Sequence, residues 1–113
     1  MAEYFLLRLR LNEPYRNPEA WTEHENNLIM QHFGFLMDLS KRGILVFAGR
    51  TEYDFSHEDL FGIALIKAES LEEAKNILFQ DPAVKAQLQI ADVHPYRMAI
   101  EAFENSIMNP FTL

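Results

Sequence analysis

The 113-residue chain contains no cysteine, which excludes disulfides, thiolate nucleophiles and cysteine-ligated zinc or iron–sulfur centres. Positive charge is also scarce, since 10 lysines and arginines stand against 17 aspartates and glutamates, for a net charge of −7. Nucleic acids and anionic membranes bind concentrated positive charge, so neither is an expected partner. The missing cysteines leave proton transfer by histidine and aspartate as the chemistry to look for.

Long apolar runs and nucleotide-binding motifs are missing as well. No stretch approaches the roughly 20 apolar residues of a membrane helix. Arg8 and Arg10 interrupt the apolar run near the N-terminus, unlike the core of a secretory signal. The sequence has no phosphate-binding loop, glycine-rich dinucleotide fingerprint, nucleophile elbow or paired metal motif. We therefore expect a cytoplasmic protein without a bound metal.

The residues that are present suit one globular domain. Hydrophobic residues make up 49% of the chain and charged residues 24%, which is enough apolar side chain to form a core. The length leaves no room for two ordinary domains. We expect one domain over residues 1–103, followed by a tail or dimer arm over residues 104–113.

Hydrophobic periodicity predicts four strands and two main helices. Residues 3–11 alternate between apolar and less apolar side chains, as in a half-buried strand. Asn17 before Pro18 is typical of a helix N-cap and first helical residue, and Ser70 with Glu73 matches a capping box. The predicted elements are strands over residues 3–11, 44–49, 60–68 and 88–103, helices over 18–42 and 70–80, and a short turn or helix over 81–86.

This βαββαβ order predicts an α+β, ferredoxin-like fold, in which a four-stranded antiparallel sheet carries both helices on one face. The helix-free face would then carry apolar side chains from the later strands: Ile63, Leu65, Tyr96, Met98 and Ile100. A bare apolar sheet face usually marks an interface. We expect a homodimer in which two copies pack sheet against sheet.

His32 and Asp81 are the first candidates for chemistry. His32 lies on the apolar side of the first predicted helix, between Leu28 and Phe35. It is either a core histidine satisfied by a hydrogen bond or a general acid–base, since histidine titrates near neutral pH. Asp81, which precedes Pro82, is either the N-cap of a short helix or the carboxylate that orients His32.

The remaining candidates concern substrate binding. Arg8, Arg10 and Arg50 form a cationic grouping, which either pairs with a carboxylate substrate or forms salt bridges with the protein's own acidic residues. Tyr53 and His24 are the other candidate substrate-binding residues. The titratable residues outside the dyad each have a structural alternative: Tyr4 and Tyr53 as packing residues, His24 as an exposed helix residue, His57 as a solvated loop residue rather than a weak cation ligand, and His94 as a structural or interface residue.

The chain resembles the YCII-related family in several short motifs over residues 3–100. The matching residues are His32 on the first helix, Arg42-Gly43-Ile44-Leu45, Ala48-Gly49, Ser70-Leu71-Glu72-Glu73-Ala74 and Asp81-Pro82-Ala83-Val84. The resemblance implies a dimeric α+β barrel, a catalytic dyad of His32 and Asp81, and lyase-like chemistry that includes dehydrochlorination. Arg50 stands where the family often has proline, and Ala86-Gln87 stand where it often has Ala-Gly. Both departures fall near the expected pocket.

Taken together, these features predict a small enzyme in which His32 moves a proton and Asp81 orients the imidazole. The expected substrate is a small organic acid or a cyclic metabolite, and the reaction, of lyase or isomerase type, needs no cofactor. The alternative is a non-catalytic dimer whose pocket binds a small molecule. A third hypothesis is an interaction module that docks through Phe111 and Leu113 of the tail.

Overall fold

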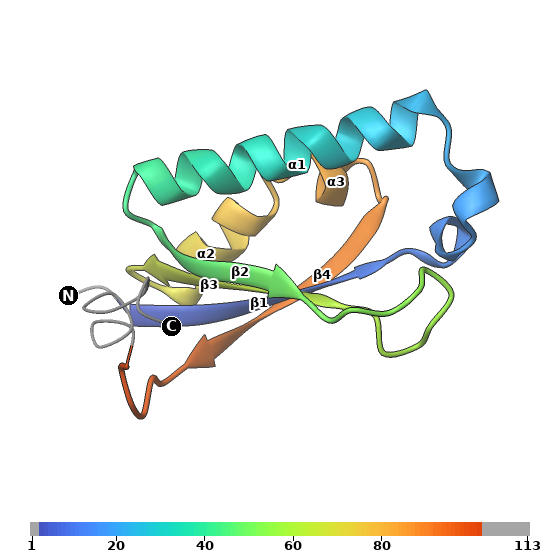
Figure 1. Ribbon diagram of the computed structural model, residues 1–113. Coiled ribbons are helices and arrows are strands. Elements are labelled where there is room, and N and C mark those ends of the chain that lie inside the picture. The colour runs from blue at the N-terminus through green and yellow to red at the C-terminus, as the bar shows by residue number, and fades with distance from the viewer. Residues whose placement is uncertain (1–2, 103–113) are drawn as a thin grey trace, which may run out of the picture.

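In the computed structural model, which describes residues 3–102, helices cover one face of a single sheet (Figure 1). The elements in chain order are β1 (Glu3–Leu11), the 3-10 helices η1 (Glu13–Arg16) and η2 (Pro18–Ala20), α1 (Glu23–Lys41), β2 (Leu45–Arg50), β3 (Gly62–Ala68), α2 (Leu71–Leu78), α3 (Pro82–Lys85) and β4 (Gln89–Tyr96). The strands lie in the order β2-β3-β1-β4, and all neighbours are antiparallel. This confirms the α+β, ferredoxin-like fold. The predicted tail over residues 104–113 lies outside the described residues.

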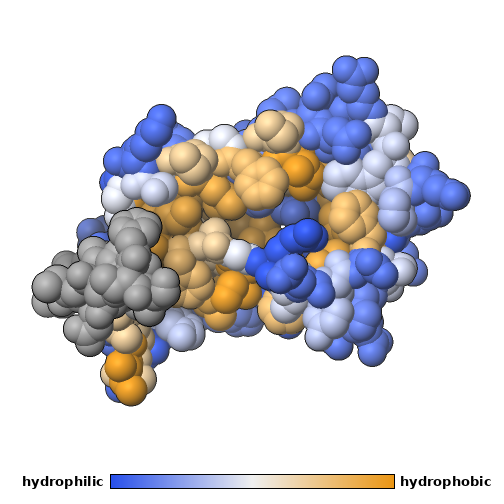
Figure 2. Space-filling model, viewed as in Figure 1, coloured by the Kyte–Doolittle hydropathy of each residue, from blue (hydrophilic) through white to orange (hydrophobic). Residues whose placement is uncertain are grey.

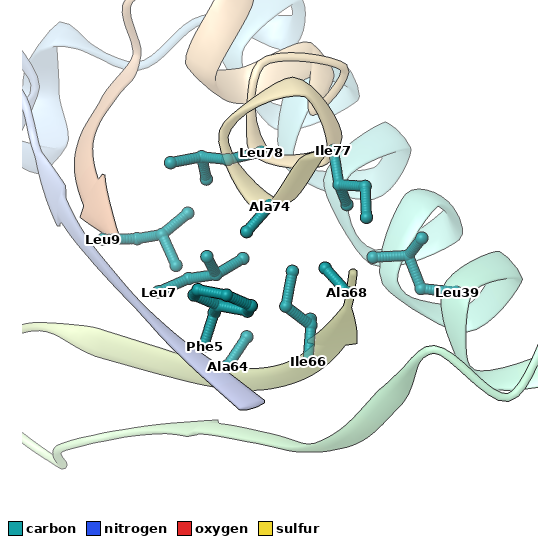
Figure 3. Packing of buried hydrophobic residues seen from close by; sticks show 10 residues of the cluster. All are labelled: Phe5, Leu7, Leu9, Leu39, Ala64, Ile66, Ala68, Ala74, Ile77 and Leu78. Carbon is teal, nitrogen blue, oxygen red and sulfur yellow. The ribbon is translucent and has the colours of Figure 1, made fainter. Parts of the chain in front are cut away.

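The core lies between the sheet and the two longer helices (Figure 3). Alternate residues of β1 face the helices and are buried, as the period of a strand requires. Leu39 of α1 and Leu78 of α2 pack toward them. The buried cluster comprises Phe5, Leu7, Leu9, Leu39, Ala64, Ile66, Ala68, Ala74, Ile77 and Leu78. This packing fixes α1 and α2 over the sheet and so positions the polar residues on their inner sides.

The first long helix begins later than the sequence pattern predicts. Asn17 and Pro18 form an N-cap and a first helical residue, but they start the short helix η2. α1 begins after Thr22, which forms a capping box with Glu25. The Thr22 N–H donates to Glu25 Oε1 at 2.7 Å, and the His24 N–H donates to the Thr22 hydroxyl at 3.2 Å. The single helix predicted for this segment is therefore two helices.

The other helix boundaries follow the predicted signals. α1 ends at Lys41, and Gly43 follows with φ of +75°, the left-handed conformation that glycine adopts without strain. Ser70 is the N-cap of α2, and its hydroxyl accepts the Glu73 N–H at 3.1 Å. Within residues 3–102, no helix is both long and apolar enough to span a membrane.

The last strand is shorter than predicted. β4 ends at Tyr96, which pairs with Tyr4 near the start of β1. Because the two strands are antiparallel, β4 ends where its partner begins. Met98 and Ile100 therefore lie beyond the strand, and their predicted place on the sheet face is wrong.

A β-bulge changes the direction of the side chains in β2. Leu45 and Phe47 pair with consecutive residues of β3, so Val46 is an extra residue on this strand. Beyond the bulge the alternation is reversed. Arg50 falls in the same cross-strand row as the core residue Leu9, which places it on the helix-covered face.

Candidate active site

His32 and Asp81 form a buried hydrogen-bonded pair. His32 Nδ1 lies 2.6 Å from Asp81 Oδ2, and only 9% and 2% of the two side chains are exposed. The apolar side of α1 packs on the core and brings His32 inward, while the turn after α2 brings Asp81 to the start of α3. The pair joins residues that are 49 positions apart in the sequence.

Asp81 has both of the roles that the sequence left open. It is the N-cap of α3, where its Oδ1 accepts the Ala83 N–H at 2.9 Å. Its other oxygen contacts His32. Pro82 occupies the first helical position and restricts the backbone there. The cap therefore holds the carboxylate in a fixed orientation toward the imidazole.

This geometry fixes the tautomer of His32. Asp81 Oδ1 accepts the Ala83 N–H, and Oδ2 lies against His32 Nδ1. An ionised carboxylate can only accept, so opposite it the imidazole donates from Nδ1. The lone pair is then on Nε2, which has no hydrogen-bond partner among residues 3–102. Such a ring can accept a proton at Nε2, and the neighbouring carboxylate stabilises the positive charge that results. This is the chemistry of a general base.

Two open hollows lie beside the end of β2, and Arg50 lines both. The larger measures about 520 Å³ and is lined by Pro18, Arg50, Tyr53, Asp54, Phe55 and Ser56. The smaller measures about 370 Å³ and is lined by Phe47, Ala48, Gly49, Arg50, Thr51, Phe61 and Ile63. Small-molecule sites range over roughly 300–1,000 Å³. In the view of Figure 2, apolar side chains cover the middle of the molecule, and a hydrophilic group interrupts them near the end of β2.

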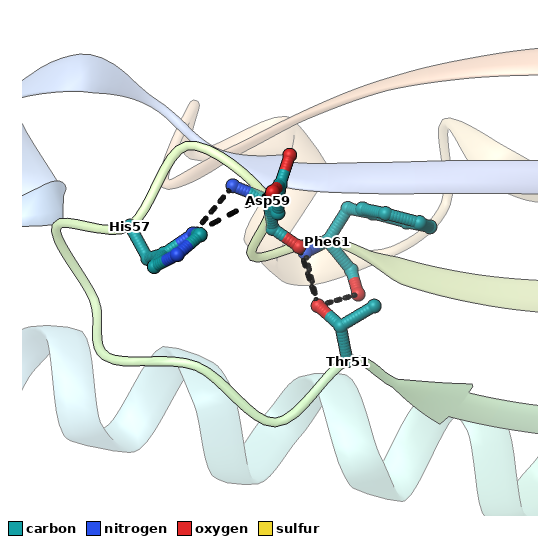
Figure 4. A network of polar contacts seen from close by, with 4 residues as sticks. All are labelled: Thr51, His57, Asp59 and Phe61. Carbon is teal, nitrogen blue, oxygen red and sulfur yellow. Dashed lines mark hydrogen bonds and ion pairs between the residues drawn. The ribbon is translucent and has the colours of Figure 1, made fainter.

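Hydrogen bonds hold the loop that borders the larger hollow (Figure 4). At its base, the Thr51 N–H donates to the Phe61 carbonyl at 2.9 Å, and the Phe61 N–H donates to the Thr51 hydroxyl at 3.1 Å. Within the loop, His57 Nδ1 accepts the Asp59 N–H at 2.9 Å. The loop is thus closed at its base and braced inside.

The structure does not bring the three predicted arginines together. Arg8 and Arg10 are alternate residues of β1 on the helix-free face, whereas Arg50 lies on the helix-covered face. The bulge in β2 reverses the alternation before Arg50, so the three arginines do not share one face of the sheet. Arg8 Nη2 pairs with Asp92 Oδ2 at 2.9 Å, while among the described residues no ion pair involves Arg50.

Asp92 is the centre of a polar network on the helix-free face. Besides pairing with Arg8, it contacts His94 Nε2 through Oδ1 at 2.7 Å. Partial burial opposes the charged form of Asp92, but the hydrogen bonds from Arg8 and His94 outweigh it and lower its pKa below the usual value. The dyad lies across the sheet from this network, on the side of the helices.

The other candidates lie outside the dyad. His24 is exposed in the first turn of α1, and Tyr4 is half-buried on the helix-free face. Tyr53, which is 46% exposed, stacks on the ring of His57 with centroids 4.0 Å apart. Over residues 3–102, no three histidine, aspartate or glutamate side chains are grouped so that they could hold a metal ion.

Sequence reasoning missed four of the six residues that line the larger hollow, among them Asp54 and Phe55. Asp54 and Phe55 lie in a polar loop without periodicity, and no motif singles them out. The available signal for Phe55 was a second aromatic side chain, beside Tyr53, within a largely polar segment. Its role depends on contact with Trp21, which lies far away in the sequence.

Comparisons with known proteins agree with this fold. A family model described as the YCII-related domain matches residues 9–97. None of the curated proteins compared with the chain matches it. Among solved structures, the chain is similar to 5-chloro-2-hydroxyhydroquinone dehydrochlorinase (TftG) from Burkholderia phenoliruptrix AC1100, in complex with 2,5-dihydroxybenzoquinone. The TM-score is 0.63 at 18% identity, and the match covers 85% of this chain and 95% of that one. At this identity the similarity shows the fold alone, and it agrees with the α+β, ferredoxin-like arrangement described above.

Proposed function

The chain belongs to the YCII-related domain family, and from this premise we propose that it is an enzyme that processes a small molecule by proton transfer. The observation that carries the proposal is the buried contact between His32 Nδ1 and Asp81 Oδ2. In this proposal His32 takes a proton at Nε2, and Asp81 keeps the ring oriented and stabilises its positive charge. A positioned general base contributes about 10²–10⁴-fold in rate, which suits an activated substrate and requires no cofactor.

The similar solved structure supports the class of reaction. That protein is a dehydrochlorinase with a dihydroxybenzoquinone bound. Loss of hydrogen chloride requires removal of a proton and departure of chloride, and His32 would supply the base for the first of these. For this chain we propose the broader class, a lyase or isomerase acting on a small organic acid or cyclic compound. A cytoplasmic location is part of the same proposal.

We further propose that the working unit is a homodimer that packs through the helix-free face of the sheet. This face combines the half-buried Ile63 with the more exposed Ile90 and Tyr96. Helices cover the opposite face (Figure 1). A second copy would remove these apolar groups from water.

Proton transfer can be tested before the natural substrate is known. Incubation in deuterated water, followed by proton NMR, detects proton abstraction at carbon whether or not a leaving group departs. The probes are 5-chloro-2-hydroxyhydroquinone and 2,5-dihydroxybenzoquinone. We expect the wild type to accelerate exchange or chloride release, and His32→Asn to lower that rate about 10²–10⁴-fold. Equal rates for the wild type, His32→Asn and Asp81→Asn would contradict the dyad.

A non-catalytic ligand-binding dimer is the second candidate. It is favoured by one observation, namely that neither hollow beside β2 includes His32 in its lining. In that case the His32–Asp81 pair only stabilises the contact between α1 and α3. The exchange experiment separates the two candidates, because a purely structural pair would give no acceleration in the wild type.

A further inference from the structure

Among residues 3–102, Arg50 has no acidic partner, although the protein as a whole is strongly acidic. Arg8 pairs with Asp92 and Arg42 pairs with Asp38. By contrast, within the described part of the chain no carboxylate lies within 4.0 Å of the Arg50 guanidinium. Arginine side chains bind carboxylates through two parallel hydrogen bonds, so a free arginine beside a hollow is suited to an anionic ligand.

Aromatic rings form the walls of the same hollow. Tyr53 and Phe55 both line it. The ring of Phe55 packs against Trp21, with centroids 5.0 Å apart and planes tilted by 47°. The indole N–H of Trp21 donates to the Tyr15 carbonyl at 2.8 Å, which ties this wall to the segment before α1. The walls are therefore held in place before any ligand binds.

We propose that this hollow binds an aromatic carboxylate, with Arg50 pairing with the carboxylate and the rings of Tyr53 and Phe55 contacting the aromatic ring. Arg50 lies on the same face of the sheet as the helices that carry His32 and Asp81. The inference rests on the proposed function in one respect, namely that the bound compound is the substrate of the dyad. It narrows the substrate class from organic acids or cyclic compounds to ring compounds that carry a carboxylate.

Asp54 is the one lining residue that opposes this ligand. Asp54 lines the hollow, so its negative charge repels an anion there, although it forms no ion pair with Arg50. Arg50 attracts a bound carboxylate and Asp54 repels it, so changes at the two residues should have opposite effects on binding. Removing the charge of Asp54 strengthens binding of a carboxylate, and removing the charge of Arg50 weakens it.

The test is direct binding, measured on the ¹⁵N-labelled chain by titration with benzoate, benzamide and benzylamine. We expect benzoate to cause saturable shifts of the Arg50 Nε–H and of the amides of residues 53–56. The neutral and cationic probes should bind at least tenfold more weakly. Arg50→Gln should weaken benzoate binding at least tenfold, with Arg50→Lys in between, since lysine keeps the charge but loses the planar fork. Asp54→Asn should strengthen it twofold or more.

One matched control variant completes the design. Arg42→Gln removes an exposed arginine at the C-terminal end of α1, whereas the hollow includes Pro18, which precedes the helix. This variant should leave benzoate binding unchanged. The inference is overturned if benzamide or benzylamine binds as well as benzoate, if the shifts occur at other residues, or if Arg50→Gln has no effect. The wild-type protein separates the two proposals, because the proposed function requires it to accelerate exchange. Benzoate binding by a wild type that has no exchange activity supports this inference and contradicts the proposed function, while wild-type activity without benzoate binding contradicts this inference alone.

Discussion

Asp81 uses its two carboxylate oxygens for different purposes, and a conservative substitution separates them. Asn is as good an N-cap as Asp, so Asp81→Asn should still accept the Ala83 N–H. The remaining amide NH₂ would then face His32 and donate to Nδ1, which moves the imidazole proton to Nε2. We expect a folded protein that has lost its base, and ¹⁵N spectra of the imidazole should report the change of tautomer. An unchanged tautomer would show that Asp81 does not orient the ring.

Complete removal of the side chain should cost far more stability. Asp81→Ala loses the cap, about 0.5–2 kcal/mol. It also leaves the buried Nδ1–H of His32 without an acceptor, about 1–3 kcal/mol more. Ser70→Ala is the matched control, because it removes the N-cap of α2 and touches no histidine. Urea denaturation should therefore show a larger loss for Asp81→Ala than for Ser70→Ala, and equal losses would contradict a stabilising contact with His32.

At the scale of single elements, the start of α1 should depend on pH. The hydrogen bond from the Thr22 hydroxyl, followed by that from the Thr22 N–H, lowers the pKa of Glu25 below its usual 4.5. A carboxylate with a lowered pKa stabilises the fold above its ordinary pKa and loses that contribution as the pH falls through the lowered value. We expect the advantage of the wild type over Glu25→Gln in unfolding free energy to shrink on acidification below pH 4.5.

The cap itself can be tested at neutral pH. Thr22→Ala removes the hydroxyl that accepts the His24 N–H, and we expect it to cost about 0.5–2 kcal/mol. Thr22→Ser keeps a hydroxyl and should cost much less. Thermal or urea unfolding monitored by circular dichroism measures both. Equal stability of the alanine and serine variants would argue against the capping box.

Local patterns predicted the elements well where one signal acted alone. The alternation of β1 and the Ser70 cap of α2 both gave correct positions. Two start signals compete before α1, because Asn17-Pro18 and Thr22 with Glu25 each resemble a helix start. At the turn between them, the indole N–H of Trp21 donates to the nearby Tyr15 carbonyl, and its ring packs against Phe55 of a distant loop. The contact with Phe55 is tertiary and cannot be read from a local pattern.

The candidate site, too, could be predicted only as far as local patterns reach. His32 and Asp81 were singled out by residue type and place, but their 2.6 Å contact results from the packing of α3 against α1. Arg50 was grouped with Arg8 and Arg10 by its charge and by its place at the end of a strand, and neither feature tells which face of the sheet it lies on. The bulge at Val46 reverses the alternation of side chains along β2. No residue type in this segment indicates a bulge.

At the scale of the whole molecule, the helix-free face of the sheet predicts the oligomeric state. We expect a dimer, and Ile90→Lys should weaken it. Ile90 is 42% exposed in the single chain, so the change should spare the fold, and it places a second cation opposite Arg10. Loss of about 1.5 kcal/mol of apolar burial in each subunit amounts to about 3 kcal/mol for the pair. That corresponds to about a hundredfold in the dissociation constant.

The outer side of α1 offers a competing interface and hence a matched control. Met30, Phe33 and Met37 recur there at helical spacing and are all exposed. If two copies met through α1, Met37→Lys would dissociate the dimer and Ile90→Lys would not. Packing through the sheet predicts the reverse. Sedimentation velocity over a range of concentrations, with circular dichroism to confirm that both variants fold, decides between them, and a monomeric wild type at micromolar concentration would contradict both arrangements.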